Sequence, residues 1–189
     1  MKDPAQERKE VLYRLDLAVA HLEASMSPLL IPDCGASLVY AIKGARDRDG
    51  VAAVPGGMVF RDGKVTAGSP CAFGADEQCA RIVLTAMKFD PDMRSAATIR
   101  FSENALAMFK GMLLECTPID CTRKAPGIST LDWDVASCCN DGVPDIIYDF
   151  GGNKKTGIMY IFGEDPVVVT NNIITVSYTH LTLPTNREV

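Results

Sequence analysis

The segment 76–91 limits the fold of this chain more than any other stretch of its sequence. Asp76 is a good helix N-cap, and Asp90 followed by Pro91 is typical of a helix end. Between them, apolar residues recur at helical spacing: Cys79, Ile82, Val83 and Ala86. The pattern predicts an amphipathic helix whose apolar face is buried against another layer of the fold.

Strand-like and helical patterns alternate around this helix. Other helices are predicted at 5–25, after the N-cap Ser102, at 133–139 and from Asp165 onward. Strands are predicted at 37–42, 96–101, 113–119, 143–148 and 158–162, and a β-hairpin is predicted around the turn Asp62-Gly63. This alternation predicts an α/β fold.

The last residues do not continue the pattern. We expect the helix that begins at Asp165 to end by Val176, because residues 177–184 lack helical periodicity. That segment resembles a translated sequencing adapter and is left out of the fold prediction. The predicted organisation is one domain over residues 1–176, followed by a tail of foreign appearance over residues 177–189.

Length, net charge and cysteine spacing indicate which kinds of ligand and location suit this chain. The 189 residues suffice for one domain with its own core, and a net charge of −5 gives no general reason to expect nucleic acid or an anionic membrane. The seven cysteines lack zinc-binding spacing, and no stretch suits a signal peptide or a membrane span. We therefore expect a cytoplasmic protein with a small-molecule ligand and no direct nucleic-acid contact, and dimerisation is left open.

Few residues offer acid–base or nucleophilic chemistry. Histidine occurs only at His21, on the first predicted helix, and at His180, in the tail. Cysteine needs an activating base, which the sequence does not indicate, and Cys79 belongs to an apolar stripe. Since the usual phosphate-binding glycine motifs and aspartate-rich metal boxes are absent, a phosphate site would be assembled from local elements.

The start of the helix at 76–91 is the best local candidate for a phosphate site, because free backbone N–H groups there attract anions. Asp76 and Glu77 oppose this hypothesis, since their carboxylates already satisfy the helix dipole. One edge of the same helix carries polar side chains that either line a site or are solvated: Gln78, Arg81, Thr85 and Lys88.

Two further places suit phosphate. Arg100 alternates with Ile99 on the predicted strand 96–101, where it either binds phosphate or forms a surface ion pair. Asp149 and Lys154 flank a glycine pair after the predicted strand 143–148. That segment is either a ligand-binding loop at the end of a strand or a plain turn.

The stretch from Phe73 to Pro91 resembles the signature of ThiN-type domains, the thiamine-phosphate synthase module of archaeal-type thiamine biosynthesis. The resemblance covers nearly the whole chain, and it includes the segments Val39-Tyr40-Ala41, Val54-Pro55-Gly56, Ile99-Arg100, Gly142-Val143-Pro144-Asp145 and Gly163-Glu164-Asp165-Pro166. It implies a three-layer α/β/α fold with a mixed sheet, similar to class II aldolases.

The resemblance also implies an activity. Active ThiN domains are transferases that join hydroxymethylpyrimidine diphosphate to hydroxyethylthiazole phosphate and release pyrophosphate. Such domains form the C-terminal module of phosphomethylpyrimidine kinase fusions, and they also serve as the sensor half of archaeal thiamine regulators. The resemblance implies no tightly bound cofactor and no metal site in the protein, although Mg²⁺ can accompany the diphosphate substrate.

Five positions depart from the family pattern. Asp76 and Glu77 replace the small hydroxyl residues that precede the family's histidine. Gly57 stands where the family has an arginine, Gln78 where it has a histidine, and Phe150 where an arginine is usual. Glycine supplies no charge for the leaving group, and glutamine cannot act as an acid or base at neutral pH. We expect the change of Gly57 to arginine and Gln78 to histidine to restore turnover at least partly.

Two functions are compared on this basis. The leading hypothesis is a domain that binds thiamine phosphate or its phosphorylated pyrimidine and thiazole precursors, with weak or lost synthase activity. The alternative is an active synthase in which Arg61, Arg81 or Arg100 supplies the positive charge that Gly57 lacks. Whether the chain is an enzyme is therefore left open. The predicted site comprises the impaired catalytic residue Gln78 and the substrate-binding residues Arg81, Arg100, Asp149 and Lys154.

Overall fold

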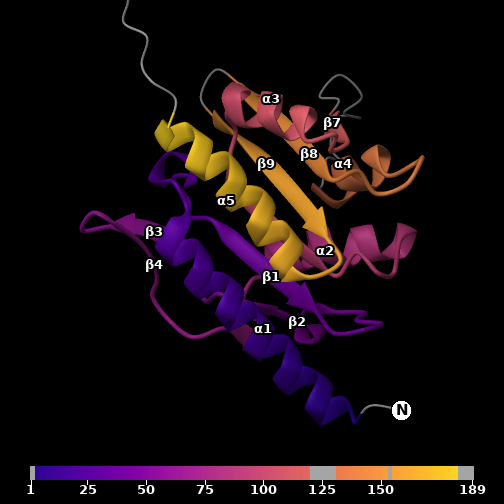
Figure 1. Cartoon of the computed structure of the whole chain (residues 1–189). Coiled ribbons are helices and arrows are strands. Elements are labelled where there is room, and N and C mark those ends of the chain that lie inside the picture. Colours follow the sequence, from indigo (N-terminus) through magenta and orange to yellow (C-terminus); the bar gives the residue numbers. More distant parts are fainter. Residues whose placement is uncertain (1–2, 120–130, 153–154, 183–189) are drawn as a thin grey trace, which may run out of the picture.

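The computed structural model describes residues 3–119, 131–152 and 155–182 (Figure 1). The α-helices in this part of the chain are α1 (Pro4–Ser25), α2 (Glu77–Phe89), α3 (Glu103–Gly111), α4 (Leu131–Cys138) and α5 (Pro166–Thr182). The strands are β1 (Ser37–Ala41), β2 (Val51–Ala53), β3 (Met58–Arg61), β4 (Lys64–Ala67), β5 (Ala72–Phe73), β6 (Ser95–Arg100), β7 (Cys116–Pro118), β8 (Ile146–Gly152) and β9 (Lys155–Gly163).

The predicted helix starts are confirmed by side-chain caps. Asp76 accepts a hydrogen bond from the backbone N–H of Cys79 at 3.0 Å, so α2 begins where the sequence indicates. Ser102 accepts one from the N–H of Ala105 and begins α3 in the same way. These local caps fix the ends of helices that lie on opposite faces of the sheet.

Seven strands form one mixed sheet in the order β5-β2-β1-β6-β9-β8-β7. Neighbouring strands are antiparallel except β7 and β8, which are parallel. Strands β3 and β4 form a separate hairpin. Its turn residues Asp62 and Gly63 have φ values of 52° and 77°, as a two-residue hairpin turn with both φ angles positive requires.

Helices cover both faces of the sheet. Buried residues of α1, α3 and α5 form one core with alternate strand residues such as Leu38 and Tyr40. Those of α2 and α4 form a second core with the intervening residues such as Val39 and Ala41. Figure 1 shows α1 and α5 side by side on the first face, and the three-layer α/β/α prediction is confirmed.

Several predicted element bounds are wrong, and the C-terminal ends of two elements differ most. β8 does not end at Tyr148 but extends to Gly152, because the glycines still pair with β9 in an antiparallel ladder. α5 continues beyond Val176 to Thr182, since Ser177 is fully buried and donates a hydrogen bond to the carbonyl oxygen of Ile173. Within the described ranges, no helix has the length and apolar character needed to cross a membrane.

Candidate functional site

A cavity of about 340 Å³ lies at the N-terminal end of α2. One side is formed by the first residues of that helix, a second by the central strands, and a third by the glycine-containing loops before β1 and β3. The residues that line it are Cys34, Gly35, Ser37, Gly56, Gly57, Ala75, Asp76, Glu77, Gln78, Cys79, Thr98, Ile158 and Tyr160.

The floor of the cavity is a row of hydroxyl groups across three adjacent strands. Ser37 of β1 pairs in register with Thr98 of β6, and Thr98 pairs with Tyr160 of β9. The backbone N–H of Ser37 also donates to the Thr98 hydroxyl oxygen at 3.0 Å. Residues directly opposite on neighbouring strands have side chains on the same face, so the three hydroxyl groups point toward α2.

Asp76 connects this floor to the helix. One carboxylate oxygen caps the N–H of Cys79 at 3.0 Å, and the other accepts a hydrogen bond from the Ser37 hydroxyl at 2.9 Å. The two bonds join α2 to β1 and fix the carboxylate at the edge of the cavity. The phosphate-attracting N–H groups of this helix end therefore face a resident negative charge, as the sequence indicates.

The rim of the cavity is also acidic. Glu77 is exposed, and its carboxylate lies 3.4 Å from the guanidinium of Arg48. Gln78 is exposed as well and lines the cavity. Among the lining residues that the structure describes, none is Arg or Lys. The cavity thus presents carboxylates, hydroxyl groups and an amide, which suit a ligand with hydrogen-bond donors or positive charge.

The glycine side of the cavity tolerates no side chain at one position. Gly57 has a φ of 73°, and a Cβ atom placed on it would lie 2.8 Å from the backbone carbonyl oxygen of Ala36. That oxygen accepts a hydrogen bond from the N–H of Met58 at 2.7 Å, so it is held in place. Gly56 has a similar φ of 75°, but a Cβ atom placed there would have no neighbouring atom within 4 Å.

The Cys79 thiol and the Tyr160 phenol are protonated at neutral pH. Burial raises the pKa of the Cys79 thiol to about 12, and the neighbouring Asp76 carboxylate adds to the shift. Burial likewise raises the pKa of Tyr160, with further contributions from nearby acidic groups. Cys79 is therefore a poor nucleophile, and Tyr160 is available as a hydrogen-bond donor.

The polar side chains predicted along one edge of α2 lie in different surroundings. Gln78 lines the cavity, whereas Thr85 is buried and donates its hydroxyl hydrogen to the carbonyl oxygen of Arg81. The guanidinium of Arg81 makes two bonds of 2.9 and 3.0 Å to Asp132 at the start of α4. Lys88 lies beside Trp133, at the other end of the helix.

Two other predicted site residues, Arg100 and Asp149, belong to β6 and β8. Arg100 donates to the carbonyl oxygen of Ile31 at 3.0 Å and to the carboxylate of Asp33 at 2.7 Å. It thereby holds the loop that leads to the cavity residues Cys34 and Gly35. Asp149 accepts a hydrogen bond from the N–H of Gly151 within β8. Lys154 is outside the described residues.

Three hydroxyl-bearing residues of the cavity are missing from the site that the sequence predicts: Ser37, Thr98 and Tyr160. Each lies on a predicted strand, and the pairing of the strands puts all three side chains on one face of the sheet. The alternation of side chains between the two faces of a strand can be predicted from the sequence. The strand pairing that aligns the three residues cannot. The available signal is a polar residue at the α2-facing position of three separate strands.

The fold defines the class of this domain. It superimposes on the crystal structure of the C-terminal domain of a phosphomethylpyrimidine kinase with a TM-score of 0.83 and 28% identity, covering 90% of this chain and 100% of that one. The L-fuculose 1-phosphate aldolase of Glaciozyma antarctica PI12 matches with a TM-score of 0.54 and 10% identity, over 96% of this chain and 76% of the aldolase chain. The second likeness concerns the fold alone, which is that of the class II aldolases.

The family follows from the sequence comparison. The family model for thiamine-phosphate synthase ThiN matches residues 14–175, and the chain belongs to that family. The bifunctional thiamine biosynthesis protein ThiDN of Methanocaldococcus jannaschii is 28% identical over 179 residues, which are 93% of this chain and 42% of that protein. Thiamine-phosphate synthase ThiN of Methanothermobacter thermautotrophicus is 26% identical over 148 residues, 75% of this chain and 78% of the relative. The chain thus spans less than half the length of the first relative.

Proposed function

We propose that this domain binds thiamine phosphate or its phosphorylated precursors in the cavity at the start of α2, and that its synthase activity is weak or lost. One observation carries the proposal: Gly57 and Gln78, the positions where the family resemblance implies an arginine and a histidine, line the same cavity although they are distant in sequence. The two departures therefore affect one site.

The charges of the cavity support binding more than turnover. Thiamine phosphate carries a cationic thiazolium ring and an aminopyrimidine, which are complementary to the carboxylates of Asp76 and Glu77. Synthesis requires a positively charged group beside the departing pyrophosphate, because negative charge develops on the pyrophosphate as the bond breaks. Gly57 supplies no such charge.

We expect Mg²⁺ to reach this domain as part of a complex with a diphosphate substrate. In the described ranges, no group of three His, Cys, Asp or Glu residues lies close enough together to hold a metal ion. Both oxygens of Asp76 are hydrogen-bonded, and Glu77 pairs with Arg48. We expect Mg²⁺ to accompany the diphosphate group of a bound substrate.

An active synthase is the second candidate, and the similarity to the thiamine-phosphate synthase of Methanothermobacter thermautotrophicus favours it. The two candidate functions differ in whether a positively charged side chain reaches the pyrophosphate. Arg81 and Arg100 are engaged by Asp132 and Asp33, so they would have to leave these partners to reach a substrate. The cytoplasmic location and the absence of direct nucleic-acid contact stay predictions, and whether the domain dimerises stays open.

Calorimetry and a turnover assay test the proposal together. The purified protein is titrated with thiamine phosphate and with each precursor, and it is then incubated with both precursors and Mg²⁺ while thiamine phosphate and pyrophosphate are measured. We expect binding with little or no product. Turnover fast enough to support growth of a synthase-deficient strain would sink the binding-only proposal, and absence of binding by all three ligands would remove both candidates.

A pair of variants tests whether binding occurs in the cavity. Gln78→Trp places a bulky side chain at its rim, and we expect it to change the affinity for thiamine phosphate severalfold or more. Asn140→Trp is the matched control, because Asn140 is also an exposed amide but lies beyond α4, beside Trp133. Equal affinities for the two variants would place the ligand elsewhere.

A further inference from the structure

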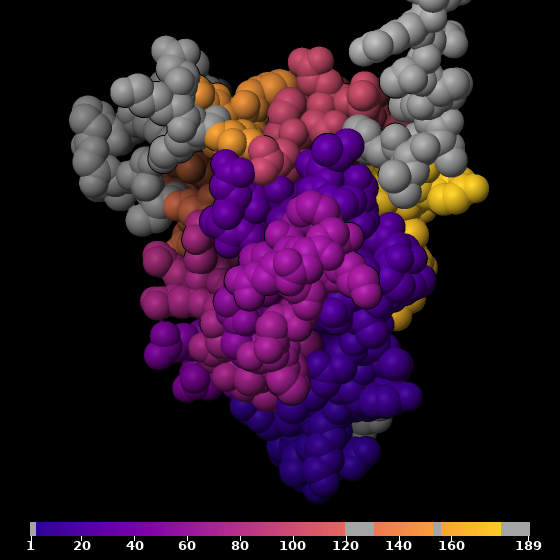
Figure 2. Space-filling model, turned by 90° about the vertical axis from the view of Figure 1, so that its left-hand side faces the viewer, coloured from indigo at the N-terminus to yellow at the C-terminus, as the bar shows by residue number. Residues whose placement is uncertain are grey.

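The β3–β4 hairpin has two chemically different faces. Met58 and Val65 belong to one face and are buried in the core that contains α1. The other face carries Val59, Arg61, Lys64 and Thr66, which line a surface hollow of about 530 Å³. The hairpin lies on the side of the molecule that faces the viewer in Figure 2, beside the indigo helix α1.

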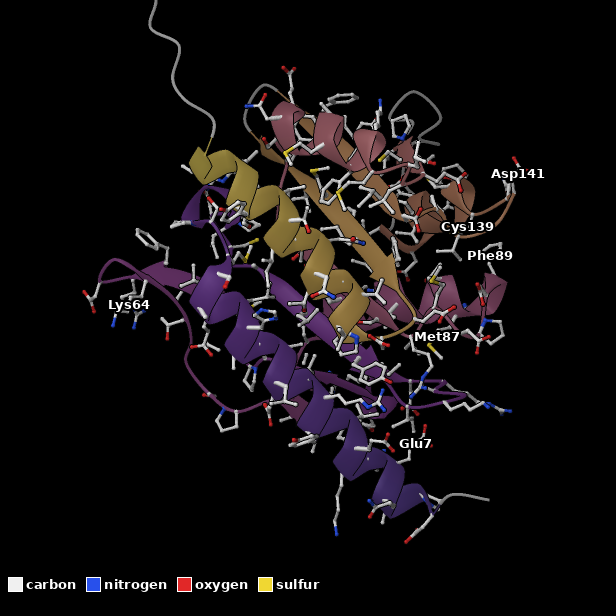
Figure 3. The ribbon with its side chains drawn as sticks, viewed as in Figure 1. Glu7, Lys64, Met87, Phe89, Cys139 and Asp141 are labelled. Carbon is white, nitrogen blue, oxygen red and sulfur yellow. The ribbon has the colours of Figure 1, made fainter. Side chains whose placement is uncertain are left out.

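Two cations of this face lie directly opposite each other. Arg61 of β3 pairs in register with Lys64 of β4, and both side chains are exposed. Figure 3 shows Lys64 near the tip of the hairpin. Within the described part of the chain, neither residue has a carboxylate within salt-bridge distance, and Asp62 in the turn is the one acidic residue that lines the hollow. Like charges directly opposite on a hairpin are destabilising, and a bound anion would offset that cost.

The hollow adjoins the cavity at the start of α2. Both are lined by Gly56 and Gly57, so the boundary between them is glycine backbone without side chains. A ligand can therefore extend from one to the other over this backbone. The cavity side is acidic and lacks Arg or Lys among its described lining residues, whereas the hairpin side carries Arg61 and Lys64.

We propose that Arg61 and Lys64 form the phosphate subsite of this domain, for a ligand that joins a cationic heterocycle to a phosphate monoester. The inference rests on the proposed function and specifies how the ligand is oriented. The ring lies against Asp76 and the hydroxyl row, and the phosphate crosses Gly56 and Gly57 to reach the two cations. Arginine and lysine both bind phosphate, arginine with two parallel hydrogen bonds.

Calorimetry with thiamine and thiamine phosphate tests this subsite, because the two ligands differ only by the phosphate. The variant carries Arg61→Gln and Lys64→Gln. We expect its affinity for thiamine phosphate to fall about tenfold or more, as expected when charge-assisted hydrogen bonds are removed, and its affinity for thiamine to stay within about twofold of that of the unmodified protein. Added salt weakens thiamine phosphate binding in the unmodified protein more than in the variant.

A second double variant, Lys9→Gln with Arg46→Gln, is the control. It makes the same change in net charge at exposed positions that do not line the hollow or the cavity, and we expect both affinities to be unchanged. Urea unfolding shows whether the hairpin variant stays folded; removal of the like-charge pair should leave its stability equal or slightly higher.

The outcomes separate the two proposals. Equal affinity of the hairpin variant and the unmodified protein for thiamine phosphate overturns the subsite alone. A parallel loss for thiamine and thiamine phosphate also overturns it, because the cations would then not act through the phosphate. If the unmodified protein binds neither ligand, the proposed function is wrong and the subsite is wrong with it.

Discussion

The helix side and the glycine side of the cavity are built in different ways. On the helix side, Gln78 projects from a regular helix and is exposed, so its side chain can change without moving the backbone. On the glycine side, the backbone itself forms the surface, and a Cβ atom at Gly57 would lie 2.8 Å from the carbonyl oxygen of Ala36. The departures that the family resemblance implies at Gln78 and Gly57 are therefore unequal: one is a local change of side chain, and the other is tied to a backbone conformation.

The largest expected loss of stability comes from a substitution on the glycine side of the cavity. We expect Gly57→Arg to lower the free energy of unfolding by about 2–4 kcal/mol, because it combines a positive φ with a backbone clash. Gly56→Arg is the control, since it has the same charge and nearly the same φ but open space around its Cβ. Urea unfolding measures both. If the two variants lose equal stability, the clash with Ala36 is not what distinguishes these positions.

This expectation bears on the repair of the family pattern. The double change of Gly57 to arginine and Gln78 to histidine adds the groups that the resemblance implies, but the first substitution requires the loop before β3 to shift. Any gain in turnover must therefore be measured on protein shown to be folded. Gly56→Arg combined with Gln78→His tests whether an arginine at the adjacent position can supply charge at a lower cost in stability.

Asp76 gives the next largest effect and tests the helix side. We expect Asp76→Ala to lose about 1–2 kcal/mol of unfolding free energy, because the cap on Cys79 disappears and the Ser37 hydroxyl loses its acceptor. Glu77→Ala is the matched control in the same turn, and its exposed pair with Arg48 should contribute at most about 0.5 kcal/mol. Chemical denaturation compares them. A loss for Asp76→Ala no larger than for Glu77→Ala would mean that the capping bonds do not stabilise this corner.

The same contrast explains what the sequence can predict. The helix side depends on local signals, a capping residue and an apolar period, so the start of α2 and the position of Gln78 follow from the residues themselves. The hydroxyl row depends on the pairing of β1, β6 and β9, whose residues are far apart in the chain. Strand alternation gives the face of each residue but not its neighbours, so Ser37, Thr98 and Tyr160 emerge as site residues only from the structure.

Ion pairs show the same limit. The sequence predicts Arg81 and Arg100 as substrate-binding residues because of their charge and their positions on a helix and a strand. Their partners, Asp132 and Asp33, lie on other elements, and only the packing of α2 against α4 and of β6 against the loop before β1 brings them together. In contrast, the cross-strand neighbours Arg61 and Lys64 can be predicted from the sequence, because a two-residue turn connects them. Their position next to the cavity is seen only in the structure, where Gly56 and Gly57 line both the cavity and the hollow.

The smallest expected effect on stability is at Gln78. We expect Gln78→His to change the free energy of unfolding by less than about 0.5 kcal/mol, because the position is exposed and histidine is only a slightly poorer helix former than glutamine. The imidazole should instead make thiamine phosphate binding depend on pH near about 6.5, the usual pKa of histidine. Calorimetry at several pH values measures this, and Gln78→Ala is the control without a titrating group. A stability loss as large as that of Gly57→Arg would show that the helix side is as constrained as the glycine side.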